Sequence, residues 1–162
     1  MEDIRSALKE LGARNGLEIE LGENGACTLE LDDGRLVLLQ ERADLNEIDF
    51  VATLGPVPED ARAEVFAELL AANFYWRETF GATLSWNADI GEVVLIYPLP
   101  LADATPESVE TIFTRFADLQ SAWAERLVNA IAAAQDCESD EDDDERDGAD
   151  VHGEGNLFEF RV

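Results

Sequence analysis

The fold class is decided by the stretch from Cys27 to Glu41, CTLELDDGRLVLLQE. In Cys27-Thr28-Leu29-Glu30-Leu31 apolar and polar side chains alternate, as they do in a strand with one buried face. Asp32-Asp33-Gly34-Arg35 supplies an Asp-Gly turn, because aspartate and glycine tolerate the positive φ of a tight hairpin. The chain returns as Leu36 to Glu41. The sequence therefore predicts an antiparallel β-hairpin.

A third strand is predicted from Ile48 to Leu54, where apolar side chains occupy alternate positions. The segment Gly55-Pro56-Val57-Pro58 is expected to end it, because proline cannot donate a hydrogen bond to a strand ladder. These features extend the first hairpin into three consecutive strands.

A second hairpin is predicted further along the chain. Thr83 to Trp86 alternates, residues 87–91 form the turn, and Glu92 to Tyr97 is the return strand. The return strand is apolar at five successive positions, so we expect both of its faces to be covered. Pro98 and Pro100 are expected to end it.

Three helices are predicted around these strands. The first runs from Glu2 to about Ala13 with a narrow apolar stripe, and the second from about Glu59 to Phe74. The last has Thr105 as N-cap, Pro106 at its first position and Glu107 in its first turn. Its apolar side chains recur at steps of three and four over about 26 residues: Val109, Ile112, Phe113, Phe116, Leu119, Trp123, Leu127 and Ile131. A stripe this long must rest on a sheet or on another chain.

The predicted order is α-βββ-α-ββ-α, which is typical of an α+β sandwich with an antiparallel sheet. The 162 residues suffice for one such domain, which we place at residues 1–134. Residues 135–155 are predicted to be an acidic, disordered tail, because like charges adjoin there with nothing apolar to bury. Residues 156–162 form a short apolar C-terminal segment.

The chain is strongly acidic, with 37 Asp and Glu against 11 Lys and Arg, a net charge of −26. Between Asp136 and Asp150 there are ten acidic residues and one arginine, but residues 1–135 still carry 25 acidic and 9 basic side chains. Such a surface repels nucleic acid and anionic lipid, because phosphate binding needs Lys and Arg. The apolar run 93–97 is far too short to span a membrane. The N-terminus lacks the apolar core of a signal peptide, so we expect a cytoplasmic protein.

The search for catalytic or metal-binding residues finds no site. His152 is the one histidine, and no phosphate-binding, zinc-protease or serine-nucleophile motif occurs. An EF-hand loop starting at Asp140 would need Gly and Glu where Glu145 and Val151 stand. Cys27 and Cys137 have neither the spacing nor the number of a disulfide framework. We therefore expect no enzyme activity, no cofactor and no metal.

Several stretches together resemble the type III secretion chaperone family of the Tir chaperone (CesT) type. They are Leu69-Leu70-Ala71-Ala72-Asn73-Phe74, the hairpin Leu84-Ser85-Trp86-Asn87 to Gly91-Glu92-Val93-Val94-Leu95, Leu99-Pro100-Leu101, and the long helix containing Phe116-Ala117 and Trp123. The resemblance covers about residues 1–133. It implies a homodimer that binds an extended N-terminal segment of a secreted effector, through apolar grooves and strands added to sheet edges, and holds it ready for export.

Two surfaces are predicted on this basis. The dimer contact is placed on the second helix and the strand after it: Phe66, Leu70, Phe74, Trp76 and Trp86. The effector-binding grooves are placed on the first helix and the neighbouring sheet: Leu8, Leu11, Leu29, Leu31, Val37 and Leu39. A further hypothesis is that the C-terminal segment, which alternates like a strand, docks on a sheet edge or on a component of the secretion apparatus through Leu157, Phe158, Phe160 and Val162.

Other functions stay open at this point. The protein is also compatible with a chaperone that sequesters a transcriptional regulator, with a chaperone-like domain that has no secretion role, or with an acidic mimic of nucleic acid. The sequence names neither the effector nor the geometry of the dimer.

Overall fold

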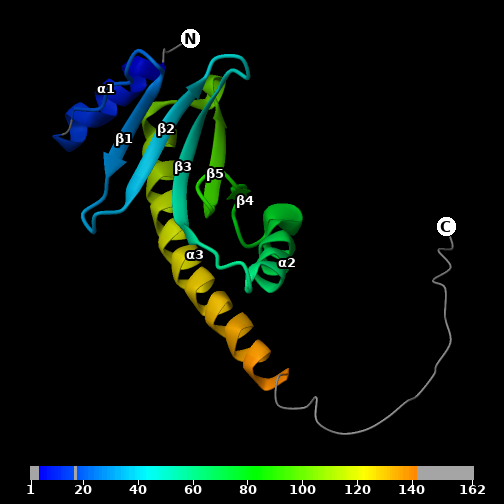
Figure 1. The fold of residues 1–162 in the computed structure, drawn as a ribbon. Helices are drawn as coiled ribbons and strands as arrows, with labels where there is room; N and C mark the ends of the chain where they lie inside the picture. The colour runs from blue at the N-terminus through cyan, green and yellow to red at the C-terminus, as the bar shows by residue number, and fades with distance from the viewer. Residues whose placement is uncertain (1–3, 17, 142–162) are drawn as a thin grey trace, which may run out of the picture.

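The computed structural model describes residues 4–16 and 18–141, with side chains as far as Asp136 (Figure 1). In chain order its main elements are α1 (Ile4–Asn15), β1 (Ala26–Glu30), β2 (Leu36–Arg42), β3 (Glu47–Pro56), α2 (Arg62–Asn73), the short 3-10 turn η1 (Phe74–Trp76), β4 (Thr83–Asn87), β5 (Glu92–Pro100), a second 3-10 turn η2 (Leu101–Asp103) and α3 (Pro106–Glu141). The predicted α+β class and the order α-βββ-α-ββ-α are confirmed.

The five strands form one antiparallel sheet in the order β1-β2-β3-β5-β4. Both predicted hairpins are present, and β3 and β5, far apart in sequence, pair along their whole length at the centre. Leu39, Phe50 and Tyr97 lie opposite one another across β2, β3 and β5, so their side chains share one face.

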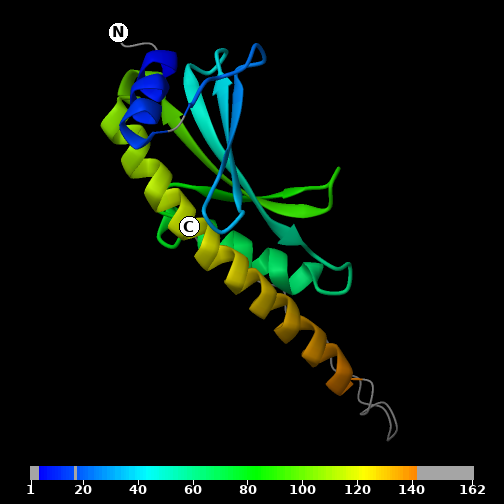
Figure 2. The same cartoon turned by 90° about the vertical axis from the view of Figure 1, so that its left-hand side faces the viewer.

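All three helices cover that same face, with α3 crossing it diagonally between α1 and α2 (Figures 1 and 2). The core between the two layers is centred on Phe50, whose ring lies 6.4 Å from that of Tyr97 and 6.0 Å from that of Phe116. The α3 stripe is buried as its periodicity predicts, at Val109, Phe116, Leu119, Trp123 and Leu127. In the described molecule the long stripe of α3 therefore rests on the sheet and on α1 and α2.

The ends of several elements differ from the prediction. Strand β5 continues through Pro98 to Pro100, which pairs with Glu47, the first residue of β3. Strand β4 pairs with β5 only as far as Ile96, so beyond Ile96 no described strand lies on the side of β5 that is turned away from β3. The prolines are tolerated there because that side has no neighbouring strand to which their missing N–H groups would have donated. Helix α2 begins at Arg62, after a turn in which the Ala61 N–H bonds to the Pro58 carbonyl.

Helix α3 begins where the sequence predicts. Thr105 is confirmed as its N-cap, because its Oγ1 accepts from the Ser108 N–H at 3.2 Å while the Ser108 Oγ accepts from the Thr105 N–H at 2.9 Å. The helix runs to Glu141, past the domain boundary predicted at residue 134. The strong helix propensity of Ala132-Ala133-Ala134 carries it onward, and the Gln135 side chain bonds to Asp60 at 3.2 Å. Residues 142–162 lie outside the described part, and with them the predicted disorder of the tail.

Candidate protein-binding site

Five large apolar side chains stand exposed around the end of α2, and we call them the aromatic surface: Leu70, Phe74, Tyr75, Trp76 and Phe80. Their exposed fractions range from 53% at Trp76 to 73% at Tyr75. The Phe74 and Tyr75 rings meet edge to face with centroids 4.7 Å apart. A cluster of exposed apolar groups of this size is typical of a protein interface.

The backbone that carries the aromatic surface is strained. Tyr75, Trp76 and Phe80 have φ values of 53°, 50° and 51°, in the left-handed region that costs a bulky residue about 1–2 kcal/mol. Two residues of α3 hold this segment. The Trp123 Nε1–H donates to the Glu78 carbonyl at 3.2 Å, and the Arg126 guanidinium lies 4.3 Å from the centre of the Trp123 ring.

Arg126 also ties the strained segment to α2. Its guanidinium forms ion pairs with Glu78, beside the aromatic surface, and with Glu68 of α2. These two hydrogen-bonded partners raise the pKa of Arg126. The exposed rings are thus presented by a braced segment, which reduces the entropy lost when a partner covers them.

An apolar groove of about 180 Å³ adjoins this segment between α2 and β4, lined by Phe66, Leu69, Leu70, Asn73, Leu84, Ser85 and Trp86. The Phe66 and Trp86 rings lie 5.2 Å apart, and the Arg62 guanidinium stacks 5.1 Å from the centre of Trp86. Three residues predicted for the dimer contact therefore share one groove, and the other two, Phe74 and Trp76, follow in η1. Their role in a dimer stays a prediction.

Asn73 fixes the groove and closes part of the edge of β4. Its side-chain amide donates to the Leu84 carbonyl and accepts from the Leu84 N–H, both at 2.9 Å. The amide thus occupies the two backbone groups that Leu84 turns away from β5, as a neighbouring strand would.

Four of the six residues predicted to bind an effector need correction. Leu8, Leu11, Val37 and Leu39 are buried in the core, where α1 and α3 pack on the sheet, so they offer no surface to a ligand. Leu29 and Leu31 are half-buried beside the edge of the sheet. Of the predicted effector-binding residues, Leu29 of β1 and Leu31 just after it therefore remain candidates.

The backbone of β1 is open beside these leucines. The Leu31 N–H donates to the Arg35 carbonyl and the Glu41 N–H to the Gly25 carbonyl, both at 2.8 Å. Because antiparallel pairs alternate, Thr28 and Glu30 turn their N–H and C=O groups away from β2.

Within residues 4–16 and 18–141, these four groups of Thr28 and Glu30 have no hydrogen-bond partner. Ala26, the next outward residue, already donates to the Asn24 side chain and accepts from the Gly22 N–H. The open edge of β1 is thus two residues long.

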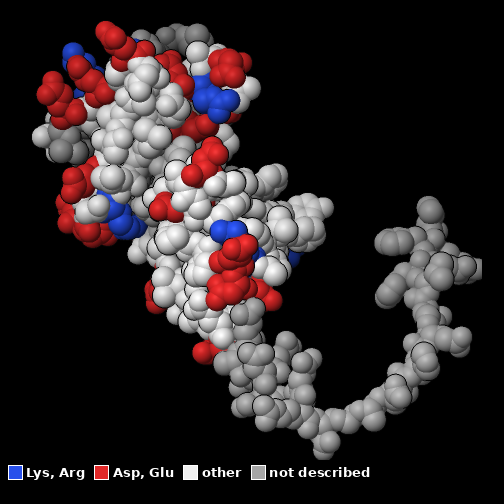
Figure 3. All heavy atoms as spheres, viewed as in Figure 1, with Lys and Arg blue, Asp and Glu red and all other residues white. Residues whose placement is uncertain are grey.

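The face of the sheet turned away from the helices carries a second apolar region, which sequence reasoning missed. Leu38, Val51 and Ile96 lie side by side across β2, β3 and β5 and are half-buried, and Val94 is buried near them. In Figure 3 uncharged atoms predominate over the middle of this face, with Asp and Glu gathered toward its upper end. The run of five apolar residues in β5 was the sequence signal for this second apolar face. The prediction that both faces of β5 are covered is wrong for the described residues, because no described helix packs on this face.

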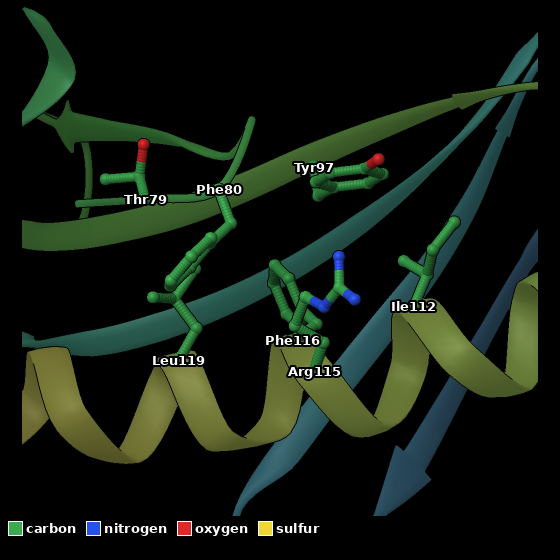
Figure 4. Close-up of a pocket in the computed structure, with 7 residues that line it drawn as sticks. All are labelled: Thr79, Phe80, Tyr97, Ile112, Arg115, Phe116 and Leu119. Carbon is green, nitrogen blue, oxygen red and sulfur yellow. The ribbon is translucent and has the colours of Figure 1, made fainter. Parts of the chain in front are cut away.

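A small pocket lies between α3, β5 and the loop after η1. Figure 4 shows Ile112, Phe116 and Leu119 projecting from α3 toward the strands, with Phe80 and Tyr97 facing them. Its volume of about 20 Å³ has room for roughly one water molecule, so it is a small gap in the packing and too small for a substrate.

The ionisable groups of the described chain show no assembled reaction centre. Burial raises the pKa of the Cys27 thiol, which makes it a poorer nucleophile. Burial also raises the pKa of the Asp49 carboxyl, with a further contribution from Glu47. Among the described residues no three His, Cys, Asp or Glu side chains are placed to hold a metal ion. Over the same residues, no helix combines the length and the apolar character needed to cross a bilayer.

An open strand edge, a braced aromatic surface and a groove between helix and sheet together define a protein-binding domain. The family model of the Tir chaperone protein (CesT) family matches residues 6–124. The chain belongs to this family, as the resemblance of its sequence predicts.

Two curated relatives match part of the chain. A protein of Chlamydia pneumoniae is 34% identical over 79 residues, which are 48% of this chain and 59% of that protein. The Tir chaperone of Escherichia coli O157:H7 is 29% identical over 92 residues, 57% of this chain and 58% of that protein. Each match therefore spans less than two thirds of the relative's own length.

Solved structures share the fold. The structure of the ExsC–ExsE complex aligns with a TM-score of 0.67 and 23% identity, over 76% of this chain and 92% of that chain. The Yersinia pestis type III secretion chaperone SycH, solved with a stable fragment of YscM2, aligns with a TM-score of 0.59 and 19% identity, over 74% and 98% of the two chains. The fold is therefore one that type III secretion chaperones use.

Proposed function

We propose that this chain is a type III secretion chaperone, which binds an extended N-terminal segment of a secreted effector in the cytoplasm and keeps it soluble and ready for export. Membership of the Tir chaperone family supports this proposal. The single observation that carries it on this molecule is the open edge of β1, where four backbone groups of Thr28 and Glu30 have no partner among the described residues and lie beside the half-buried Leu29 and Leu31.

An effector segment lying along β1 would satisfy these groups. Each backbone hydrogen bond contributes a net stabilisation of about 1 kcal/mol, and alternate side chains of the segment would cover the exposed parts of Leu29 and Leu31. Backbone pairing tolerates many sequences, so the apolar side chains supply the selectivity. The mechanism is binding alone, with no catalytic step and no cofactor.

The chaperone would act as a homodimer joined through the aromatic surface and the groove between α2 and β4. Covering these groups removes a large apolar area from water, which is the main favourable term in association. A two-fold interface brings the same patch of each protomer together, so Leu70, Phe74 and Trp86 would meet their own counterparts or near neighbours.

The proposal is tested by co-expressing the full chain with a secreted protein of the same cell, with and without that protein's N-terminal segment. We expect co-purification only when the segment is present. The proposal would be contradicted if the shortened protein were recovered equally well, or if the chain bound none of the secreted proteins of that system.

A further inference from the structure

The stretch of chain that contains the open edge of β1 is acidic throughout. Between Arg14 and Arg35 it carries six carboxylates and no Lys or Arg: Glu18, Glu20, Glu23, Glu30, Asp32 and Asp33. All six side chains are exposed, and Asp and Glu gather on the side of the molecule where α1 and β1 lie (Figures 1 and 3). Such a cluster alone is a solvated surface, but here it borders an edge with four backbone groups that lack a partner among the described residues.

These carboxylates are largely uncompensated. Arg35 pairs with Asp33 at 2.8 Å, and the other five form no ion pair with a described residue. Arg35 is itself engaged, since its guanidinium also donates to the Ala117 carbonyl of α3 at 2.7 Å and so fastens the turn after β1. A segment that approaches β1 therefore meets net negative charge.

The charge lies close enough to act on a paired strand. Glu30 is one of the two residues whose N–H and C=O turn outward, and Thr28, the other, is two residues away, which is about 7 Å in a strand. This is less than the screening length of about 8 Å at physiological ionic strength. Asp32 follows the edge at one end, and at the other end the Glu20 backbone N–H donates to the Cys27 thiol, which brings a further acidic residue to β1.

A strand paired with β1 has two faces with different neighbours. Thr28 and Glu30 turn their side chains to the outer face of the sheet, whereas Leu29 and Leu31 turn theirs toward the helices. The residue opposite Glu30 thus lies on the outer face next to a carboxylate, and the residues opposite Leu29 and Leu31 lie next to apolar groups. A second outer-face position, two residues further along, extends toward Asp32.

We propose that the segment bound at β1 is cationic on its outer face, with Lys or Arg opposite Glu30 and at the position toward Asp32, and apolar on the face that meets Leu29 and Leu31. This assignment rests on the proposed function, because it names the class of segment that the same edge accepts. Charge adds a second source of selectivity, since a segment with Asp or Glu at the two outer positions would place like charges opposite each other.

Synthetic peptides titrated into the full-length chain test the proposal, with the Thr28 and Glu30 amides followed by NMR. The peptide Ser-Lys-Leu-Lys-Val-Thr-Ser has the proposed pattern for an antiparallel strand, and its two matched controls replace both lysines by glutamine or by glutamate. Each cross-strand pair of opposite charges changes the affinity by a factor of about two to five. We therefore expect the glutamine peptide to bind about 5-fold and the glutamate peptide about 25-fold more weakly than the lysine peptide.

Variants of the chain place the effect at the edge. Glu30→Gln with Asp32→Asn should lower the affinity for the lysine peptide by about fivefold. The matched control, Glu59→Gln with Glu64→Gln, removes two exposed carboxylates in and just before α2, which packs on β4 at the opposite edge of the sheet, and should leave the affinity unchanged. Raising the salt concentration from about 0.05 M to about 0.5 M should abolish most of the difference between the lysine and glutamate peptides, because the screening length shortens.

Equal affinity of the three peptides, with shifts at Thr28 and Glu30, would overturn the charge preference and leave strand addition intact. Shifts that the lysine peptide causes only at other amides would overturn it as well, because the charges would then draw the peptide to a different surface. If no peptide binds, both the preference and strand addition at β1 are contradicted. A charge preference at the edge, in a chain that co-purifies with no secreted protein, would support this inference and contradict the proposed function.

Discussion

Replacing Leu70 by aspartate tests the proposed dimer contact with little disturbance of the fold. Leu70 is 71% exposed and stands at the rim of the groove between α2 and β4. Its removal therefore takes little from the core. The lower helix propensity of aspartate and its charge near the C-terminal end of α2 together cost about 1 kcal/mol of folding free energy.

The effect on a dimer is larger because a two-fold interface contains the substitution twice. Burying one leucine contributes about 1.5–3 kcal/mol, so the Leu70→Asp dimer loses about 3–6 kcal/mol before the two carboxylates are counted. Since 1.4 kcal/mol is a factor of ten, the dissociation constant should rise by about 10²- to 10⁴-fold.

Sedimentation equilibrium over a wide range of protein concentration measures this change. The matched control is Leu45→Asp, which adds the same charge at a 55% exposed leucine in the turn between β2 and β3, away from the aromatic surface. We expect a monomer for Leu70→Asp and an unchanged dimer for Leu45→Asp. A Leu70→Asp protein that dimerises as tightly as the wild type would refute the placement of the interface.

Two further substitutions test the internal account of the fold. Asn73→Ala leaves the Leu84 N–H and C=O without their side-chain partners, so the free energy of unfolding in urea should fall by about 1–3 kcal/mol, and an unchanged value would show that water replaces the amide fully. Asp49→Asn tests the buried carboxyl, whose pKa is raised in the folded state by burial and by Glu47 and Asp44, against the attraction of Arg42. A raised pKa makes the folded state less stable as pH rises above the ordinary value of about 4, so Asp49→Asn should be more stable than wild type at pH 7, with a gap that narrows as pH falls. A gap that widened in acid would contradict this sign.

Local patterns in the sequence predict most of the fold, because each hairpin carries its own turn and each helix its own periodicity. The alternation before and after Asp33-Gly34 and the cap at Thr105 are decided by neighbouring residues. The pairing of β3 with β5 joins residues far apart in the chain, and only the packing of the whole sheet reveals it. That pairing also extends β5 through its prolines.

The candidate site is harder to predict, since an apolar stripe does not say what covers it. Leu8 and Val37 follow the same apolar pattern as residues of a binding groove would, but Leu8 points from α1 into the core and Val37 lies in the same core on the sheet. Tyr75 and Phe80 are exposed because Trp123 and Arg126 hold their segment in a strained conformation, a contact across 45 or more positions of sequence. Of the effector-binding prediction, Leu29 and Leu31 stay accessible, because they lie at an edge.

The central claim is that a partner segment binds by adding a strand to β1, and Thr28→Pro tests it most directly. The Thr28 N–H points away from β2, so proline removes one edge donor and places its ring in the path of an added strand without breaking the existing ladder. The matched control, Thr28→Val, keeps the backbone donor and the branched side chain. Calorimetric titration with the effector's N-terminal segment should show about tenfold weaker binding for Thr28→Pro than for Thr28→Val, with both proteins melting as cooperative folded domains. Equal affinity of the two variants would contradict the account.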